Sequence, residues 1–159
     1  FIDHVRFRID NFLFPNIGDN YQISKSLESF ANGGLFGQGI GNGTVSKNLP
    51  DAHSDFIYAL IGEEFGFITA FFILIFYIII YIRIYIVSKI TKNLFILNSL
   101  TGLGNILIFQ TIINISSSLN LLPTKGMTLP FISYGGSSII SSSLVVGFIL
   151  TLIKNAKNQ

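Results

Sequence analysis

Three long apolar runs constrain this chain more than any other feature of its sequence. The first extends from residue 56 to 87, and weaker runs cover 97–118 and 136–153. A helix of about 20 apolar residues is long enough to cross the hydrocarbon of a bilayer. Only 11% of the residues are charged, whereas soluble domains carry about 25%. The sequence therefore predicts an all-α polytopic membrane protein with three transmembrane helices, at 55–87, 97–118 and 136–153.

Polar side chains lie inside the second and third of these spans. Asn105, Gln110 and Asn114 belong to the second, and residues 141–143 of the third are serines. Because such groups are costly in lipid, we expect them to face other helices. The only methionine is Met127, so we also expect that upstream sequence has been lost from this chain.

Basic residues set the expected orientation. They gather between the first two spans and after the third: Arg83, Lys89, Lys92, Lys154 and Lys157. Cytoplasmic loops carry an excess of Lys and Arg, so we expect residues 88–96 to form a cytoplasmic loop and 154–159 a cytoplasmic tail. Residues 1–54 and 119–135 then form extracytoplasmic loops. The first of these contains a short amphipathic helix predicted at 21–32.

Several common functions find no support in the composition. The glycine-rich segment 37–43 does not match a dinucleotide fingerprint, because Asn42 and Thr44 occupy the places where the third glycine should fall. It is better interpreted as a flexible or sharply bent loop. A net charge of +2 does not indicate a nucleic-acid partner, and the absence of cysteine excludes thiol chemistry. His4 and His53 are the only histidines, and no metal-ligand spacing is evident.

Three acids near the start of the first span are candidates for function. A carboxylate at Asp55 would suit the N-terminus of a helix, so a capping role competes with a catalytic one. Glu63 and Glu64 lie one to two turns deeper, where carboxylates by default suggest function. The alternative for both is a buried structural role with a basic partner elsewhere in the protein.

A second polar segment, residues 122–138, contains two prolines, three glycines and Lys125. Such a backbone cannot be a regular helix, and at membrane depth it must be buried or line a cavity. Gly135, Gly136 and Ser137 come at the predicted start of the third span. Free N–H groups at that helix start would suit an anion such as a phosphate. A solvated loop lysine is the alternative for Lys125.

Both polar segments resemble signature sequences of the SEDS family, which comprises FtsW, RodA and SpoVE. Residues 49–67 read LPDAHSDFIYALIGEEFGF, and residues 122–138 read LPTKGMTLPFISYGGSS. The segment GGLFGQGIGNG, at 33–43, also fits. The resemblance implies a fold of roughly ten helices, of which this chain would be the C-terminal part. The Lys-Gly pair after Pro-Thr is most similar to the cell-division branch.

The resemblance also implies roles for single residues. Asp55 matches the family's essential acid, while Asp51 and Ser54 stand where Glu and Thr are usual. Both departures are conservative. Glu64 and Lys125 match other positions linked with function.

Members of this family are peptidoglycan glycosyltransferases that polymerise lipid II, so the resemblance implies this activity. Asp55 would accept the proton of the attacking hydroxyl, and positive charge or N–H groups would hold the departing lipid diphosphate. The predicted substrate-binding residues are Lys125, Glu64, His53, Ser133, Gly135, Gly136 and Ser137. No cofactor is evident, although a divalent cation assisting the diphosphate is compatible with this chemistry.

The implied partners are lipid II, a class B penicillin-binding transpeptidase and other membrane proteins of the division apparatus. The implied location is the bacterial cytoplasmic membrane at the division septum. With its other helices missing, we expect this fragment alone to be inactive. Two alternatives stay open from the residues: a flippase or transporter of lipid II, which needs no chemistry at Asp55, and a non-catalytic division scaffold.

Overall fold

The computed structural model describes residues 21–49, 52–123 and 125–157. In this part of the chain the elements are α2 (Tyr21–Gly33), a 3₁₀ turn η1 (Ser46–Asn48), α3 (Ile57–Ile90), α4 (Leu94–Ser118) and α5 (Gly136–Lys157). Three of them, α3, α4 and α5, are long and apolar enough to cross a membrane. The predicted all-α membrane architecture with three spans is therefore confirmed.

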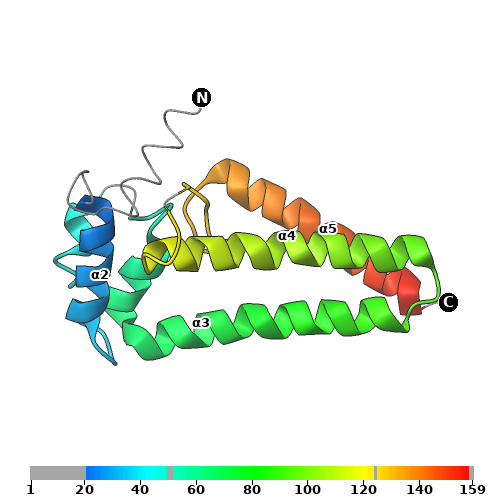
Figure 1. Ribbon diagram of the computed structural model, residues 1–159, viewed down its shortest axis with the longest axis horizontal. Coiled ribbons are helices and arrows are strands. Elements are labelled where there is room, and N and C mark those ends of the chain that lie inside the picture. The colour runs from blue at the N-terminus through cyan, green and yellow to red at the C-terminus, as the bar shows by residue number, and fades with distance from the viewer. Residues whose placement is uncertain (1–20, 50–51, 124, 158–159) are drawn as a thin grey trace.

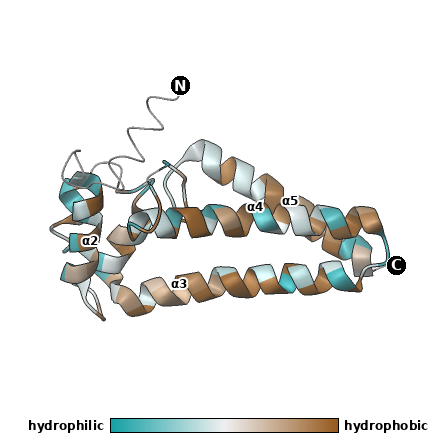
Figure 2. Cartoon of the chain, viewed as in Figure 1, coloured by the Kyte–Doolittle hydropathy of each residue, from teal (hydrophilic) through white to brown (hydrophobic). Residues whose placement is uncertain are grey.

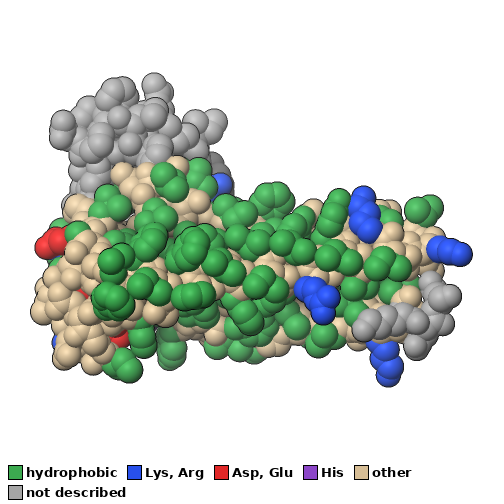
Figure 3. Space-filling model, turned by 90° about the horizontal axis from the view of Figure 1, so that it is seen from below, with side chains coloured by type: hydrophobic (Ala, Val, Ile, Leu, Met, Phe, Trp, Pro, Cys, Tyr) green, Lys and Arg blue, Asp and Glu red, His purple; other side chains and the backbone are tan. Residues whose placement is uncertain are grey.

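The three long helices form an elongated bundle, with α2 and its loops gathered at one end (Figure 1). The long part of α3 lies beside α4, and residues 91–93 connect them at the opposite end. Helix α5 packs on α4 and α3. Apolar residues dominate the long helices, whereas α2 carries more hydrophilic ones (Figure 2). Lysine and arginine side chains gather mainly at the end away from α2 (Figure 3).

Helix α4 begins earlier than the apolar run alone predicts. The run indicates a start at Leu97, but the helix starts at Leu94. The side chain of Asn93 caps it by accepting hydrogen bonds from the amides of Phe95 and Ile96, at 3.0 and 3.4 Å. Asparagine is a favoured N-cap because its oxygen satisfies amides that have no partner in the first turn.

The polar side chains of α4 are bonded inside the protein, as expected. Asn105 accepts a hydrogen bond of 2.9 Å from the hydroxyl of Tyr81 on α3. Gln110 donates to the carbonyl of Thr128 at 3.0 Å. Asn114 is fully buried and is bonded on both sides, as described below. These contacts give the side chains of Asn105, Gln110 and Asn114 partners inside the protein, although Oδ1 of Asn114 is buried without a hydrogen-bond partner.

A break at Gly66 divides α3. This residue has φ of 85° and ψ of 170°, so the helix changes direction there. In an unbroken helix, the amides of Phe67 and Ile68 would donate to the carbonyls of Glu63 and Glu64. Here both pairs of groups lose those partners. We expected a helix from about Asp55 to residue 87. The observed helix runs from Ile57 to Ile90 and is divided at Gly66. The expectation that it enters lipid after the glutamates stays a prediction.

The glycine-rich segment after α2 replaces the missing hydrogen bonds. The amides of Phe67 and Ile68 donate to the carbonyls of Gly34 and Leu35, at 2.9 and 3.3 Å. In return, the amides of residues 38 and 39 donate to the carbonyls of Glu63 and Glu64, both at 2.9 Å. The amides of Phe67 and Ile68 and the carbonyls of Glu63 and Glu64 therefore all have partners.

Glycine is needed where the two segments approach so closely. A Cβ atom added to Gly37 would lie 2.3 Å from the carbonyl oxygen of Glu64, and one added to Gly66 would lie 2.4 Å from that of Leu35. Both glycines also have positive φ. The predicted bent loop is thus a segment docked into a helix break.

Candidate functional site

The two polar segments singled out in the sequence meet at the α2 end of the bundle, and Asn114 of α4 joins them. Its side-chain Nδ2 donates to the carbonyl of Asp55 at 2.9 Å and to the carbonyl of Met127 at 2.6 Å. Because Asn114 is fully buried, water does not compete for these bonds. One amide of α4 thus fixes the turn before α3 against the segment before α5.

Asp55 lies in this turn, just before α3. The helix begins at Ile57, and the residue at its N-cap position is Phe56. The carboxylate is half-buried and faces the backbone of Gly126: a Cβ atom added there would lie 3.1 Å from Oδ2 of Asp55. Lys125, the neighbouring residue, is exposed. The geometry therefore brings the predicted acid next to the predicted lysine segment.

Ser133 has a different place from the one expected. It is 1% exposed, its Oγ donates to the carbonyl of Ser54 at 2.6 Å, and it accepts from the amide of Leu129 at 2.7 Å. The amide of Tyr134 adds a bond of 2.8 Å to the carbonyl of His53. Since the Ser133 hydroxyl is fully engaged inside the protein, we assign it to positioning the turn and no longer to substrate contact.

The start of α5 is open. The helix begins at Gly136, and both Gly136 and Ser137 are exposed while Gly135 is partly buried. The hydroxyl of Ser138 donates back to the carbonyl of Gly135 at 2.9 Å. The amides of the first turn of a helix have no partner within the helix and point away from it. These free amides could bind an anion, as predicted. Anion binding at this helix start stays a prediction.

A pocket of about 480 Å³, called the polar pocket below because charged and polar side chains form part of its wall, lies beside the turn at residues 53–54. Glu64 and His53, two of the predicted substrate-binding residues, line it together with Lys47 and Tyr134. Ser46, Leu49, Ala52, Ser54 and Leu60 complete its wall. Asp55 does not belong to this wall, so the predicted residues divide between two neighbouring places. Sequence reasoning missed Lys47 and Tyr134.

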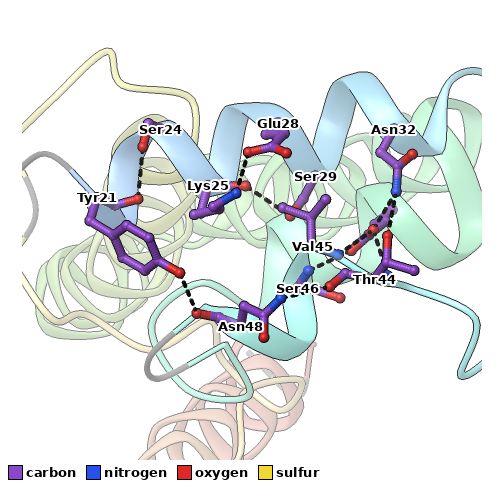
Figure 4. Close-up of polar contacts among 11 residues, drawn as sticks. Tyr21, Ser24, Lys25, Glu28, Ser29, Asn32, Thr44, Val45, Ser46 and Asn48 are labelled. Atoms are coloured by element: carbon purple, nitrogen blue, oxygen red, sulfur yellow. Dashed lines mark hydrogen bonds and ion pairs between the residues drawn. The ribbon is translucent and has the colours of Figure 1, made fainter.

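Glu63 and Glu64 are adjacent but have different environments. Glu63 is fully buried, and its carboxylate accepts hydrogen bonds from the amides of Thr44, Val45 and Ser46 at 2.9, 3.0 and 2.7 Å. Asn32 of α2 donates a further bond of 2.6 Å. Figure 4 shows Asn32, Thr44, Val45 and Ser46 with their polar groups converging.

Glu63 therefore has a buried structural role, which the sequence analysis gave as the alternative to a functional one. That alternative expected a basic side chain as the partner of Glu63. The observed partners are three backbone N–H groups and the side-chain amide of Asn32. A buried acid beside a glycine-rich loop is a signal that backbone amides serve as its partners, since short glycine-rich segments expose them. Glu63 fixes the start of η1 and, with it, the segment that carries Lys47.

The described residues contain no set of side chains that could hold a metal ion. Among residues 21–49, 52–123 and 125–157, no three histidine or acidic side chains gather around one point. Asp51 of the signature segment lies outside the described residues, as do His4 and three further acids. Divalent-cation assistance therefore stays a prediction.

Comparison with known proteins gives a consistent result. A family model described as FtsW, RodA and SpoVE cell cycle proteins matches residues 3–158. A "Probable peptidoglycan glycosyltransferase FtsW" of Caulobacter vibrioides is 40% identical over 152 residues, which are 96% of this chain and 39% of that protein. The protein of the same name from Buchnera aphidicola subsp. Acyrthosiphon pisum is 45% identical over 139 residues, 85% of this chain and 35% of that protein.

A solved structure has the same arrangement. It comes from a study of how a peptidoglycan synthase complex coordinates polymerisation and crosslinking. It matches with a TM-score of 0.74 and 25% identity over 97% of this chain and 43% of that one. The chain thus spans about two fifths of the length of these relatives. The family model covers nearly the whole sequence, and both signature segments lie together in the fold. The chain therefore belongs to the FtsW/RodA/SpoVE family of cell cycle proteins.

Proposed function

We propose that the full-length protein is a peptidoglycan glycosyltransferase that polymerises lipid II during septal wall synthesis. It would lie in the bacterial cytoplasmic membrane as a multi-pass protein, with its α2 end outside. The concentration of Lys and Arg at the opposite end supports this orientation (Figure 3). The names of the relatives support the activity.

One observation carries the proposal: the Asp55 carboxylate faces the Lys125–Gly126 segment, and Asn114 holds the two together. In glycosyl transfer the acceptor hydroxyl loses a proton as it attacks the anomeric carbon of the donor. Asp55 would accept this proton. A half-buried carboxylate fits this role, because it is accessible to substrate but fixed in place by its backbone.

The leaving group is a lipid diphosphate, whose negative charge increases as the glycosidic bond breaks. Lys125 and the amides of residues 135–137 would stabilise this charge, since both are exposed at the same end of the bundle. Attack from the opposite face of an α-linked donor would give a β-linked product. A divalent cation, if required, would neutralise the diphosphate further, and chelation tests this directly.

The partner we propose is a class B penicillin-binding transpeptidase, which crosslinks the strands that this protein makes. The similarity to a structure from a peptidoglycan synthase complex supports it. Co-purification of the full-length protein with that transpeptidase tests the association independently of catalysis.

The decisive experiment is polymerisation of labelled lipid II by the purified full-length protein with its transpeptidase in detergent. A flippase or scaffold makes no polymer under these conditions, so product formation separates the three candidate functions. We expect Asp55→Asn to abolish polymer while leaving co-purification intact. Polymerisation by Asp55→Asn at the wild-type rate would refute the catalytic role. Ser54→Thr, which introduces the residue usual in the family, is the matched control and should remain active.

A further inference from the structure

Three cavities follow one another from the membrane-spanning helices to the polar pocket. The first, of about 420 Å³, lies between α3, α4 and α5 and is bounded by Pro130, Phe131 and Ile132. Its wall is almost wholly apolar and includes Phe72, Phe76, Ile80, Leu107, Ile108 and Val146. The third is the polar pocket of Lys47 and Glu64.

The second cavity, of about 450 Å³, shares wall residues with each of the other two. It has Phe131 and Ile132 in common with the apolar cavity. It has His53 and Tyr134 in common with the polar pocket. The four residues belong to two short turns that hydrogen bonds fasten together, including the bond from the amide of Tyr134 to the carbonyl of His53.

The turn at Phe131 has an unusual and fixed conformation. Phe131 has φ of 63°, which a bulky side chain rarely adopts. The hydroxyl of Tyr77 on α3 donates to the carbonyl of Pro130, and the amide of Ser133 donates to the carbonyl of Leu129 at 3.0 Å. These bonds place the Phe131 ring, which is 50% exposed, where the apolar wall gives way to polar groups.

The walls are apolar in the first cavity and carry charged and polar side chains in the third, which suits a ligand with a hydrocarbon chain and a polar head. The apolar cavity offers only hydrocarbon contacts. The polar pocket offers a carboxylate, an ammonium group, an imidazole, hydroxyl groups and the Tyr134 ring, which is 81% exposed. A simple anion or cation would meet a charge of its own sign there, whereas a neutral saccharide can use donors, acceptors and an aromatic face together.

We propose that the three cavities form one binding path for a prenyl-linked saccharide, with its hydrocarbon chain between α3 and α5 and its sugar in the Lys47–Glu64 pocket. This inference rests on the proposed function and assigns parts of the substrate to residues. Lys47 and Tyr134 become sugar-binding residues, Phe131 marks the change from chain to head, and Glu63 positions Lys47 through the hydrogen bonds to residues 44–46.

The ammonium of Lys47 is already partly held in place. It donates to the carbonyl of Gly41 at 2.7 Å, so the long side chain loses less freedom when it binds a ligand. Glu64 stands on the first, short part of α3, and its carbonyl is bonded to the amide of Gly39. The ammonium of Lys47 and the backbone of Glu64 are thus both bonded to the glycine-rich segment.

The test measures binding of two fluorescent forms of lipid II to the full-length protein in detergent. One form has the natural long prenyl chain and the other has a geranyl chain. Val146→Phe narrows the apolar cavity ten residues along α5 from Gly136, about 15 Å from the head. We expect it to raise Kd for the long-chain form about tenfold and to leave the geranyl form unchanged. Ile80→Trp is a second narrowing variant, in case the first does not fold.

The polar end is tested with the same two ligands. Glu64→Gln and Tyr134→Ala should raise Kd for both forms by a similar factor, about tenfold. Glu28→Gln is the matched control, because this exposed acid of α2 pairs with Lys25 outside the pocket. It should change neither Kd.

The possible results test the site of the hydrocarbon chain, the site of the sugar and the proposed function separately. If both narrowing variants raise Kd equally for the two forms, or change neither, another helix of the full-length protein fills the cavity and the inference is wrong. If Glu64→Gln leaves both Kd values unchanged, the saccharide binds elsewhere. If the narrowing variants weaken binding of the long-chain form alone but the wild type makes no polymer, the binding path stands and the proposed function fails.

Discussion

The amide of Gly39 lies 2.9 Å from the carbonyl oxygen of Glu64 and donates to it. In a continuous helix the amide of Ile68 would occupy this place, but the break at Gly66 moves it away. A loop residue from another part of the chain therefore completes the hydrogen bonding of a membrane helix. This exchange connects the glycine-rich segment to the short part of α3 that carries Glu63 and Glu64.

The first prediction concerns Gly66. Replacement by alanine meets two obstacles: φ of 85° is unfavourable for a residue with a side chain, and the new Cβ atom would lie 2.4 Å from the carbonyl oxygen of Leu35. The backbone strain alone costs about 1–3 kcal/mol. We expect Gly66→Ala to lower the melting temperature of the full-length protein and to speed hydrogen exchange of the amides of Gln38 and Gly39.

Gly102→Ala is the control for this change, because Gly102 lies inside α4 and a Cβ atom there meets nothing within 4 Å. Alanine favours the helix by about 1 kcal/mol, so the control should be neutral or stabilising. Equal melting temperatures for Gly66→Ala and the wild type would show that the docked segment does not depend on this glycine.

The second prediction separates the two adjacent glutamates. Glu63→Gln replaces one carboxylate oxygen with an NH₂ group, which then faces an N–H donor of residues 44–46 or of Asn32. Leaving such buried groups without a partner costs about 1–3 kcal/mol. Glu64→Gln, at the partly exposed neighbour, should change stability by less than about 0.5 kcal/mol. Thermal unfolding of the full-length variants in detergent measures both.

The opposite order of these two effects would contradict the structure, because it would make Glu64 the buried structural acid. The pair also gives a functional contrast. Glu64→Gln should lose saccharide affinity in a stable protein, whereas Glu63→Gln should lose affinity together with stability.

The third prediction concerns the bridge at Asn114. Asn114→Leu keeps a similar volume but removes the donor shared by the carbonyls of Asp55 and Met127. Two partly buried carbonyls would lose a partner, at up to about 1–3 kcal/mol each. We expect lower stability and a reduced rate of polymerisation, because Asp55 would no longer be fixed against the lysine segment. Asn98→Leu, at an exposed position of the same helix, should affect neither quantity.

The spans could be predicted from the sequence because hydrophobic length is a strong signal. The apolar run of α3 hid its break, however, since a glycine with positive φ looks like any glycine inside a helix. The hydrogen bonds that occupy the break come from residues about 30 positions earlier, and no local pattern indicates such a long-range exchange. Periodicity and spacing alone would have missed it.

The candidate site, too, could be predicted only in part from the sequence. The signature segments pointed to Asp55 and Lys125, and the fold brings their segments together. The sequence did not indicate that the Ser133 hydroxyl is buried and engaged, nor that Lys47 lines a pocket with Glu64. Both facts depend on tertiary contacts between turns, which short polar motifs do not specify. Serine in particular occurs equally well in a binding site and in a buried turn.

The last prediction tests the close approach of Gly126 to Asp55. Gly126 has φ of 63°, and a Cβ atom there would lie 3.1 Å from Oδ2 of Asp55. Gly126→Ala should therefore displace the carboxylate. A misplacement of about 1 Å in a catalytic group can reduce activity by up to about 100-fold, so we expect a large loss of polymerisation. Binding of the long-chain lipid II should persist, because Gly126 does not line the binding path. Gly147→Ala, in α5 with no atom within 4 Å of its Cβ position, is the control and should retain activity. If Gly126→Ala polymerises lipid II as the wild type does, the position of the Asp55 carboxylate beside this segment is not required for the reaction, and the base must be sought among other acids of the full-length protein.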